Sequence, residues 1–311
     1  MQCADPDRME RDDVTTGKLV LTGITKSYGT RRVLDDVSFE VAPGRLTGFV
    51  GGNGAGKTTT MRIVLGLLNS DGGQVALDGR ALTSADRRQF GYMPEERGLY
   101  PKMKVLEQIV YLARLHGFDK TDATTRATAL LTELGLEERL NDTIESLSLG
   151  NQQRAQIAAA LVHDPEVLIL DEPFSGLDPL AVDVVASVLQ SSAARGASIL
   201  FSSHQLDVVE RLCDDLVILA GGTIRAAGSR DGLRAQHAGD RYELVSAGDA
   251  GWLRSEPGVT VLDFEGGYAL FDADGPETAQ RVLRTAVDRG DVASFAPKHP
   301  SLAQIFKEVI Q

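Results

Sequence analysis

Short apolar runs alternate with segments of helical periodicity from Leu19 to about Ser229. The run Val167–Leu170, for example, has four apolar residues followed by two acids. A run this short and this apolar is typical of a strand buried on both faces of a parallel sheet, with helices covering the two faces. The alternation therefore predicts an α/β fold. The predicted strands are Leu19–Thr25, Val37–Val41, Leu46–Val50, Val75–Leu77, Gln89–Met93, Val167–Leu170, Ser198–Ser202 and Leu216–Leu219, and the predicted helices are Thr58–Leu68, most of Val105–Leu147, Asn151–Val162 and Ala181–Ala194.

The pattern changes after Ser229. Strands are predicted at Arg241–Ser246, Val259–Phe264, Tyr268–Asp272 and Val292–Phe295, with helices at Ala250–Arg254 and Glu277–Asp288. The order βαββαβ resembles a ferredoxin-like unit. A last helix begins after Ser301, with Gln304 closing a capping box. We therefore expect three parts: a disordered tail over residues 1–18, a main domain over residues 19–229 and a smaller accessory domain over residues 236–311.

Composition narrows the classes of function. The 311 residues include 44 acidic and 32 basic side chains, which give a formal charge of −12, and 42% of the residues are apolar. This composition is too apolar for a disordered chain, and the excess of acid predicts that nucleic acid is not a partner. No apolar run approaches the ~18 residues that a membrane-spanning helix needs, and the first residues lack the apolar segment of a secretory signal. We expect a globular protein without a membrane span of its own.

One glycine-rich segment fits a phosphate-binding loop. Gly51–Thr58 has the sequence G-G-N-G-A-G-K-T, which matches the pattern G-x-x-x-x-G-K-[ST]. Phosphates need exposed backbone N–H groups that point inward, and glycine leaves these groups accessible. Lys57 would reach the β- and γ-phosphates, the Thr58 hydroxyl would ligate Mg²⁺, and the following helix would point its positive end at the anion. A glycine-rich turn is the alternative, but the motif follows a predicted strand and opens a predicted helix, as phosphate binding requires.

Two acids, Asp171 and Glu172, follow the apolar strand Val167–Leu170. The carboxyl ends of parallel strands form the edge of the sheet where ligands bind. Downstream of a phosphate loop, Asp171 would hold Mg²⁺ through water, and Glu172 would polarise the attacking water as a general base. Considered alone, such a pair could equally be a solvated strand end.

Further motifs resemble those of ABC ATPases. Leu147–Arg154, with the sequence L-S-L-G-N-Q-Q-R, is similar to the signature of that family, and Ser175–Asp178 resembles its D-loop. His204 resembles the family's switch histidine, and Tyr28 its adenine-stacking aromatic residue. Considered singly, these features could be a helix cap, a turn, a surface histidine and a core tyrosine. The match covers about residues 19–229, and the motifs occur in the family's order.

The resemblance implies a fold and a site. The implied fold is α/β: a P-loop NTPase core of the ABC-ATPase type, with an antiparallel β subdomain and a helical subdomain, plus the small C-terminal α+β (ferredoxin-like) domain. Residues 19–229 would be the ATP-binding domain of an ABC transporter, with ATP and Mg²⁺ as cofactors. The implied nucleotide-binding residues are Tyr28, Gly51, Gly52, Asn53, Gly54, Ala55, Gly56, Lys57, Thr58, Thr59, Ser148, Gly150, Asn151, Gln152 and Asp178; the implied metal-binding residues are Thr58, Glu95 and Asp171; and the implied catalytic residues are Glu172, His204 and Glu95.

Several positions depart from the family pattern. Glu95 stands where the family usually has a glutamine. A carboxylate can still ligate Mg²⁺ or orient water, but it adds negative charge beside the γ-phosphate, so we expect altered metal dependence rather than inactivity. Gly52 replaces a usual proline, and Leu149 and Asn151 replace glycine and glutamine in the signature. The stretch Gly91–Pro101 and the C-terminal pattern P-S-L-x-x-I-F resemble the NatA-type branch, which is grouped with sodium and drug exporters.

The resemblance also implies partners. In ABC ATPases the signature of one copy closes over the ATP held by another, so a second nucleotide-binding domain is required, and a homodimer is favoured over a heterodimer. Transport would need an integral membrane permease subunit, and this chain would be peripheral, at the cytoplasmic face of the cell membrane. The candidate permease contacts are Leu99, Tyr100, Pro101 and Met103, for which local packing is the alternative. For the C-terminal domain we hypothesise a regulatory or dimer-stabilising role.

The leading interpretation is therefore an ATPase, the motor subunit of an ABC transporter and specifically of an exporter. Three alternatives stay open: a non-transport ABC ATPase, an importer ATPase subunit, and an ATP-gated binding module with negligible turnover. The transported substrate is not encoded in these motifs, because in this family specificity lies in the membrane subunits.

Overall fold

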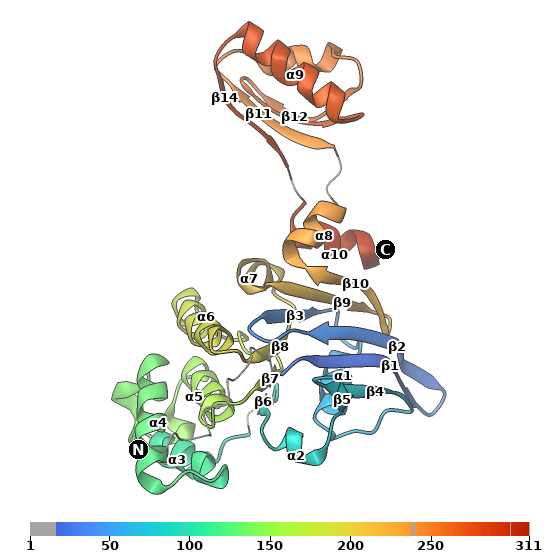
Figure 1. The fold of residues 1–311 in the computed structure, drawn as a ribbon. Coiled ribbons are helices and arrows are strands. Elements are labelled where there is room, and N and C mark those ends of the chain that lie inside the picture. The colour runs from blue at the N-terminus through green and yellow to red at the C-terminus, as the bar shows by residue number, and fades with distance from the viewer. Residues whose placement is uncertain (1–16, 97, 238–239, 299, 311) are drawn as a thin grey trace, which may run out of the picture. The chain divides into compact units, whose positions relative to one another are not determined.

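The computed structural model describes residues 17–96, 98–237, 240–298 and 300–310. The chain divides into two compact units, with the boundary between Gly228 and Ser229. Figure 1 labels most helices and strands of both units. The first unit has the strands β1 (Leu19–Tyr28), β2 (Arg31–Val41), β3 (Leu46–Val50), β4 (Gly72–Leu77), β5 (Arg80–Ala81), β6 (Gly91–Met93), β7 (Val167–Leu170), β8 (Ser198–Ser203), β9 (Asp215–Ala220) and β10 (Thr223–Ser229). Its helices are α1 (Lys57–Val64), α2 (Ser84–Arg87), α3 (Val105–Leu115), α4 (Lys120–Glu133), α5 (Leu149–Leu161), α6 (Pro179–Ala194) and α7 (Leu206–Leu212), with 3₁₀ turns η1 (Glu137–Arg139) and η2 (Ile144–Ser146).

A six-stranded sheet forms the centre of the first unit, with the strand order β10-β9-β3-β8-β7-β6. The pairs β9-β3, β3-β8, β8-β7 and β7-β6 are parallel. All four residues of β7 are buried, as the unbroken apolar run predicts. Val167 and Ile169 belong to the large core cluster on one face, which leaves Leu168 and Leu170 for the opposite face. The α/β fold predicted from the sequence is confirmed.

A second, antiparallel sheet with the order β2-β1-β4-β5 faces this core. Its side chains pack in one cluster with helix α1 and the central sheet; the cluster includes Leu21, Phe39, Phe49, Met61 and Ile169. The antiparallel β subdomain expected from the family resemblance is therefore present. It places the β1–β2 turn and the loop after β3 in the same part of the unit.

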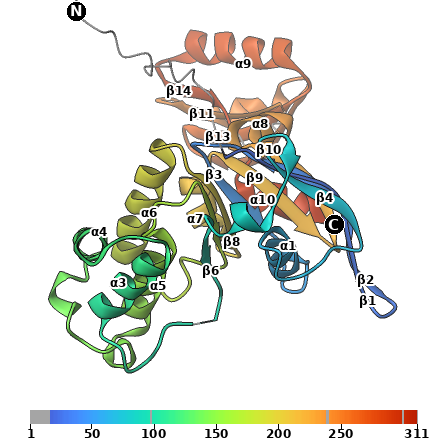
Figure 2. The ribbon, with the colours of Figure 1, turned by 60° about the horizontal axis from the view of Figure 1, so that its bottom comes forward.

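Helices α3, α4 and α5 pack together beside β6, and Figure 2 shows this group from a second direction. This group is the expected helical subdomain. His116, at the end of α3, stacks on His163, just after α5, with ring centroids 3.7 Å apart. Nε2 of His163 lies 3.3 Å from the carbonyl oxygen of Phe90, before β6. The histidine pair thus joins the helical subdomain to the edge of the central sheet.

Some predicted boundaries were wrong. The helix predicted to reach Leu68 ends at Val64, because Gly66 has φ +69° and closes the helix. Gly66 donates to the carbonyl of Ile63 and Leu67 to that of Arg62, which is a Schellman ending. The prediction also missed β10, the short elements α2 and β5, and helix α7.

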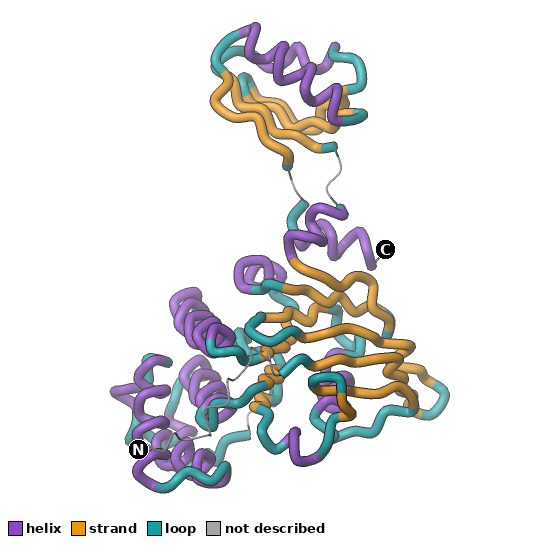
Figure 3. The backbone as a smooth tube through the Cα atoms, viewed as in Figure 1, coloured by secondary structure: helices purple, strands orange, loops and turns teal. Residues whose placement is uncertain are grey.

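The second unit comprises α8 (Arg230–Gln236), β11 (Arg241–Ser246), the 3₁₀ helix η3 (Ala250–Ser255), β12 (Val259–Glu265), β13 (Tyr268–Ala273), α9 (Pro276–Arg289), β14 (Val292–Pro297) and α10 (Leu302–Ile310). Its sheet has the order β12-β13-β11-β14 and is antiparallel throughout. Since β11 and β12 both run antiparallel to β13 between them, they form the split βαβ arrangement of a ferredoxin-like unit. Helix α9 covers one face of this sheet, as the tube in Figure 3 shows. The first helix of the predicted pattern is a 3₁₀ helix, and the predicted capping box of Ser301 with Gln304 is present.

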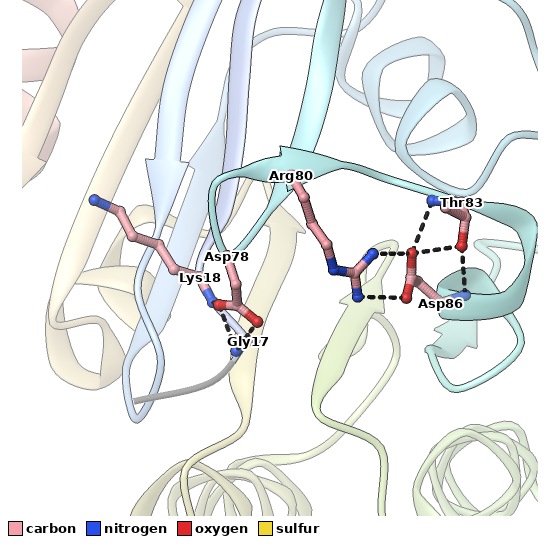
Figure 4. A network of polar contacts seen from close by, with 6 residues as sticks. All are labelled: Gly17, Lys18, Asp78, Arg80, Thr83 and Asp86. Atoms are coloured by element: carbon pink, nitrogen blue, oxygen red, sulfur yellow. Dashed lines mark hydrogen bonds and ion pairs between the residues drawn. The ribbon is translucent and has the colours of Figure 1, made fainter. Parts of the chain in front are cut away.

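The predicted disordered tail lies outside the described residues except for Gly17 and Lys18. Both amides donate to the carboxylate of Asp78, at 2.9 Å, as Figure 4 shows. In the same view Asp86 accepts from Arg80 and Thr83, and these bonds hold the pKa of the Asp86 carboxyl well below its usual range. The described end of the chain is thus bonded to the turn after β4.

Candidate functional site

The loop between β3 and α1 has the geometry of a phosphate cradle. Gly54 and Gly56 have φ of +74° and +114°, a region that residues with a Cβ rarely adopt. A Cβ on Gly51 would collide with the carbonyl oxygen of Leu219 on β9, so the loop lies tightly over the sheet. Lys57, at the start of α1, is buried and donates from Nζ to the carbonyl of Gly51, at 2.7 Å. The lysine therefore arches back over the loop that would hold the phosphates.

This loop lines a cavity of about 430 Å³. Segments distant in the sequence meet there, and most of the predicted site residues are among them. The lining residues are Tyr28, Arg31, Val33, Gly52, Asn53, Gly54, Ala55, Gly56, Lys57, Thr58, Thr59, Glu95, Asp171 and Glu172. Gly51 is not among the lining residues, but its carbonyl accepts the hydrogen bond from Lys57.

Asp171 lies at the carboxyl end of β7 and is almost completely buried. Its Oδ2 accepts a hydrogen bond from the hydroxyl of Thr58, at 2.9 Å, and its Oδ1 accepts from Ser202 at the end of β8. Helix α1 and the neighbouring strand β8 thus fix one oxygen each of this carboxylate. Burial raises the pKa of the Tyr92 phenol on β6, and the negative charge of Asp171 adds to that shift. The phenol therefore stays neutral beside the carboxylate.

Glu172, the next residue, is only 9% exposed and has φ +53°. A non-glycine residue in this region costs energy and persists only where its surroundings hold it. Its N–H donates to the hydroxyl of Ser202, at 2.8 Å, and its carbonyl accepts from the side chain of Gln153, at 3.0 Å. Nδ1 of His204, just after β8, lies 2.9 Å from Glu172 Oε2. The structure brings two of the three predicted catalytic side chains, Glu172 and His204, into contact.

Glu95 lines the cavity from the loop after β6. Gln156 on α5 donates to the carbonyls on either side of this residue, those of Pro94 at 2.8 Å and Glu96 at 3.1 Å. The position of Glu95 is therefore set by a side chain from the helical subdomain.

The signature residues lie outside this cavity. Ser148 is the N-cap of α5 and accepts from the amide of Asn151, at 3.3 Å. Gln152 donates to the carbonyls of Ile144 and Leu147, and Asp178 caps α6 by accepting from Ala181. Five predicted nucleotide-binding residues are thus not brought to the chain's own phosphate loop: Ser148, Gly150, Asn151, Gln152 and Asp178.

Sequence reasoning missed several residues of this site. Ser202 bonds both Asp171 and Glu172, while Arg31 and Val33 line the cavity beside Tyr28. Ser202 ends a predicted strand next to the strand of Asp171, so its position at the shared sheet edge was the available signal. For Gln153 and Gln156 no such signal existed, because a helical glutamine gives no indication of its carbonyl partner.

The donor set at the cavity fits a magnesium ion. Mg²⁺ is commonly held by one or two carboxylates together with nucleotide phosphates and water. Thr58 and Asp171 offer a hydroxyl and a carboxylate side by side, and Glu95 and Glu172 line the same cavity. Within the described ranges, no three His, Cys, Asp or Glu side chains form a metal-binding cluster of their own. The protein would therefore supply only part of the coordination shell.

Two family models match the chain. The model described as "ABC transporter" matches residues 34–175, and the model described as "ATP-binding protein DrrA1-3-like, C-terminal domain" matches residues 228–310. In the part of the chain that the structure describes, no helix combines the length and apolar character needed to cross a membrane.

Curated relatives and solved structures agree with these matches. The uncharacterised ABC transporter ATP-binding protein YhaQ of Bacillus subtilis is 36% identical over 94% of this chain and 98% of its own length. The Nod factor export ATP-binding protein I of Bradyrhizobium diazoefficiens is 35% identical over 92% of this chain and 94% of its own. A solved structure of the ATP-binding subunit of an ABC transporter has a TM-score of 0.64 and 37% identity, covering 70% of this chain and 92% of that one.

Proposed function

The chain belongs to the ATP-binding subunits of ABC transporters, which are ATPases, and we propose that it is the motor of an exporter. One observation carries the proposed site. The phosphate loop, Asp171 and Glu172 line a single cavity, and Glu172 is in contact with His204. Nucleotide phosphates, a carboxylate base and its orienting histidine can therefore meet in one place.

The proposed roles follow from these positions. Lys57 and the loop amides bind the β- and γ-phosphates, and Tyr28 stacks on the adenine. Thr58 and Asp171 hold Mg²⁺, which supplies neutralising charge for the phosphates when bound. Glu172 accepts the proton of the water whose oxygen attacks the γ-phosphorus, and the bond between that phosphorus and the leaving oxygen of ADP breaks. His204 fixes the orientation of Glu172.

We propose that a second copy of the chain completes each site. Ser148 and Gly150 lie outside the chain's own cavity, at the N-terminus of α5, where free amides favour an anion. Their placement supports a head-to-tail dimer in which they bind the γ-phosphate of the ATP held by the partner. ATP then favours the closed dimer, and loss of the γ-phosphate opens it.

A surface on the helical subdomain supports the permease contact. Tyr100, Pro101 and Met103 line a hollow of about 670 Å³ with Lys102, Tyr111 and Glu145. Its exposed tyrosines form an apolar surface with polar rims, which suits a short segment of a membrane subunit. We therefore place the chain as a peripheral subunit at the cytoplasmic face of the membrane.

Export is supported by similarity. The Bradyrhizobium relative is described as a Nod factor export ATP-binding protein. We propose the NatA-type sodium and drug export branch on the stretch Gly91–Pro101 and the C-terminal pattern P-S-L-x-x-I-F.

The proposal is tested with Glu172→Gln, which keeps the shape of the side chain but cannot accept the proton. Its mass is measured by light scattering with and without Mg-ATP, and nucleotide binding is measured separately. We expect the wild-type chain to hydrolyse ATP and the variant to have lost turnover. We expect the variant to form a dimer only when ATP is present. A variant that binds ATP and stays monomeric would contradict the homodimer. A wild-type chain that does not bind ATP would contradict the site.

A further inference from the structure

Helix α5 carries two buried glutamines one turn apart. Gln153 and Gln156 are 5% and 4% exposed, and their spacing of three residues places them on the same face of the helix. A buried amide without a hydrogen-bond partner lowers the stability of the folded chain. The hydrogen bonds of these two glutamines therefore fix the position of the groups that accept them.

Each glutamine donates hydrogen bonds to the main chain of one loop. Gln153 bonds the loop that carries Glu172, and Gln156 bonds the loop that carries Glu95. Gln153 donates from Nε2 to the carbonyls of Glu172 and Pro173, at 3.0 and 3.1 Å. Gln156 donates from Nε2 to the carbonyls of Pro94 and Glu96, which flank Glu95. The two carboxylates are 77 positions apart along the chain, yet one helical turn sets the backbone beneath both.

Other side chains of α5 bond it to the rest of the helical subdomain. Gln152 bonds the carbonyls of Ile144 and Leu147, and Arg154 donates to the carbonyl of Leu134, at 2.8 Å. The N-terminus of α5 begins at Ser148, the residue expected to meet a partner's ATP. The helix therefore runs from the proposed contact with one nucleotide to the carboxylates around another.

We infer that Gln153 and Gln156 are positioning residues: they lock the main chain beneath Glu172 and Glu95 to α5, so that a shift of this helix against the sheet displaces both carboxylates together. This inference rests on the proposed function. In this geometry, a ligand that binds the signature residues of a chain acts on Glu172 and Glu95 of the same chain through α5. The ligand does not need to contact these two carboxylates.

The test uses the full-length chain and the variants Gln153→Met and Gln156→Met, which keep side-chain length but remove the donor. Steady-state hydrolysis gives kcat and KM for ATP, and hydrogen–deuterium exchange follows segments 91–96 and 171–177. We expect kcat to fall at least tenfold with KM within threefold. We also expect exchange to accelerate in the segment that each glutamine holds, while α6 exchanges as in the wild type.

Gln108→Met is the matched control, because Gln108 is a 1% exposed amide on α3 that does not line the nucleotide cavity. It should keep kcat within twofold of the wild type. Gln153→Asn and Gln156→Asn, which retain the amide but shorten its reach, serve as a second pair if the methionine variants fail to fold. They should show the same local exchange and the same loss of kcat.

The outcomes separate the inference from the proposed function. Wild-type kcat and wild-type local exchange in folded variants would overturn the positioning role and leave the ATPase assignment intact. Accelerated exchange spread evenly over the unit would also overturn it, because it would show general destabilisation. A wild-type chain without hydrolysis would contradict the proposed function, while the exchange experiment would still decide the link to α5.

Discussion

Nδ1 of His204 lies 2.9 Å from Oε2 of Glu172, and the two residues come from the ends of neighbouring strands. Glu172 is held by its own N–H and carbonyl in a backbone conformation that glutamate rarely adopts. The histidine therefore contacts a carboxylate whose main chain is already fixed. Its remaining freedom is in the side chain, which His204 restrains.

Replacing His204 with alanine should remove that restraint. We expect kcat for ATP hydrolysis to fall at least tenfold while KM for ATP stays within threefold, because the histidine does not line the nucleotide cavity. The matched control is His237→Ala in the second unit, where Nδ1 lies 3.3 Å from Glu308 Oε2. Unchanged kcat in His204→Ala would refute the orienting role.

Tyr28 is 52% exposed and lines the cavity, so its ring is available for stacking on a base. Stacking of a base on an aromatic side chain contributes about 1–3 kcal/mol. Tyr28→Ala should therefore weaken ATP binding at least fivefold in a fluorescent-nucleotide titration, whereas Tyr28→Phe should bind as the wild type does. Equal loss in both variants would point to the hydroxyl instead of the ring.

Glu95 places a carboxylate where the family usually has an amide. In Glu95→Gln we expect the half-saturating Mg²⁺ concentration for hydrolysis to rise at least threefold, because one oxygen ligand is weakened. KM for Mg-ATP should not rise, since negative charge beside the phosphates is removed. Glu96→Gln is the control, as the Glu96 side chain does not line the cavity. Identical magnesium titrations for both variants would exclude Glu95 from the metal site.

The histidine pair between the helical subdomain and the sheet predicts a pH dependence of stability. Burial lowers the pKa of His163 to about 4, and the neighbouring His116 ring contributes to this shift. The ordinary histidine pKa is about 6.5. At pH values between this pKa and the pKa of about 4 in the folded chain, the unfolded chain binds more protons than the folded one. Stability contributed by the neutral ring is therefore present above pH 6.5 and is lost as the pH falls.

This dependence is measured by urea unfolding of the first unit between pH 7 and pH 5. The slope from one such group is at most about 1.4 kcal/mol per pH unit. His163→Phe keeps an aromatic ring for stacking but cannot be protonated, so its stability should change less with pH. Parallel curves for the variant and the wild type would show that His163 does not carry the effect.

The sequence was sufficient where a local pattern determines local structure. The run Val167–Leu170 matched its strand residue for residue, and Gly51–Thr58 formed the expected loop between a strand and a helix. Boundaries failed where a single backbone angle decided them, as at Gly66. β10 was missed because its sequence, T-I-R-A-A-G-S, has only one β-branched apolar residue, so pairing with β9 outweighs its weak propensity.

The site was predictable as a set of residues but not as a network. Asp171 and Glu172 could be placed at a sheet edge from their position after a strand. The positive φ of Glu172 and its bonds to Ser202 and Gln153 depend on the three-dimensional arrangement of distant segments. No spacing in the sequence encodes such contacts.

The hydrogen bonds that Gln153 and Gln156 donate end at main-chain oxygens. A hydrogen bond to a main-chain oxygen does not depend on which side chain the accepting residue carries. Substitutions in the loops around Glu95 and Glu172 can therefore accumulate while the frame beneath them is inherited unchanged. Under the proposed metal-binding role of Glu95, the preference for a metal can be altered one side chain at a time in this loop without rebuilding the helix that supports it.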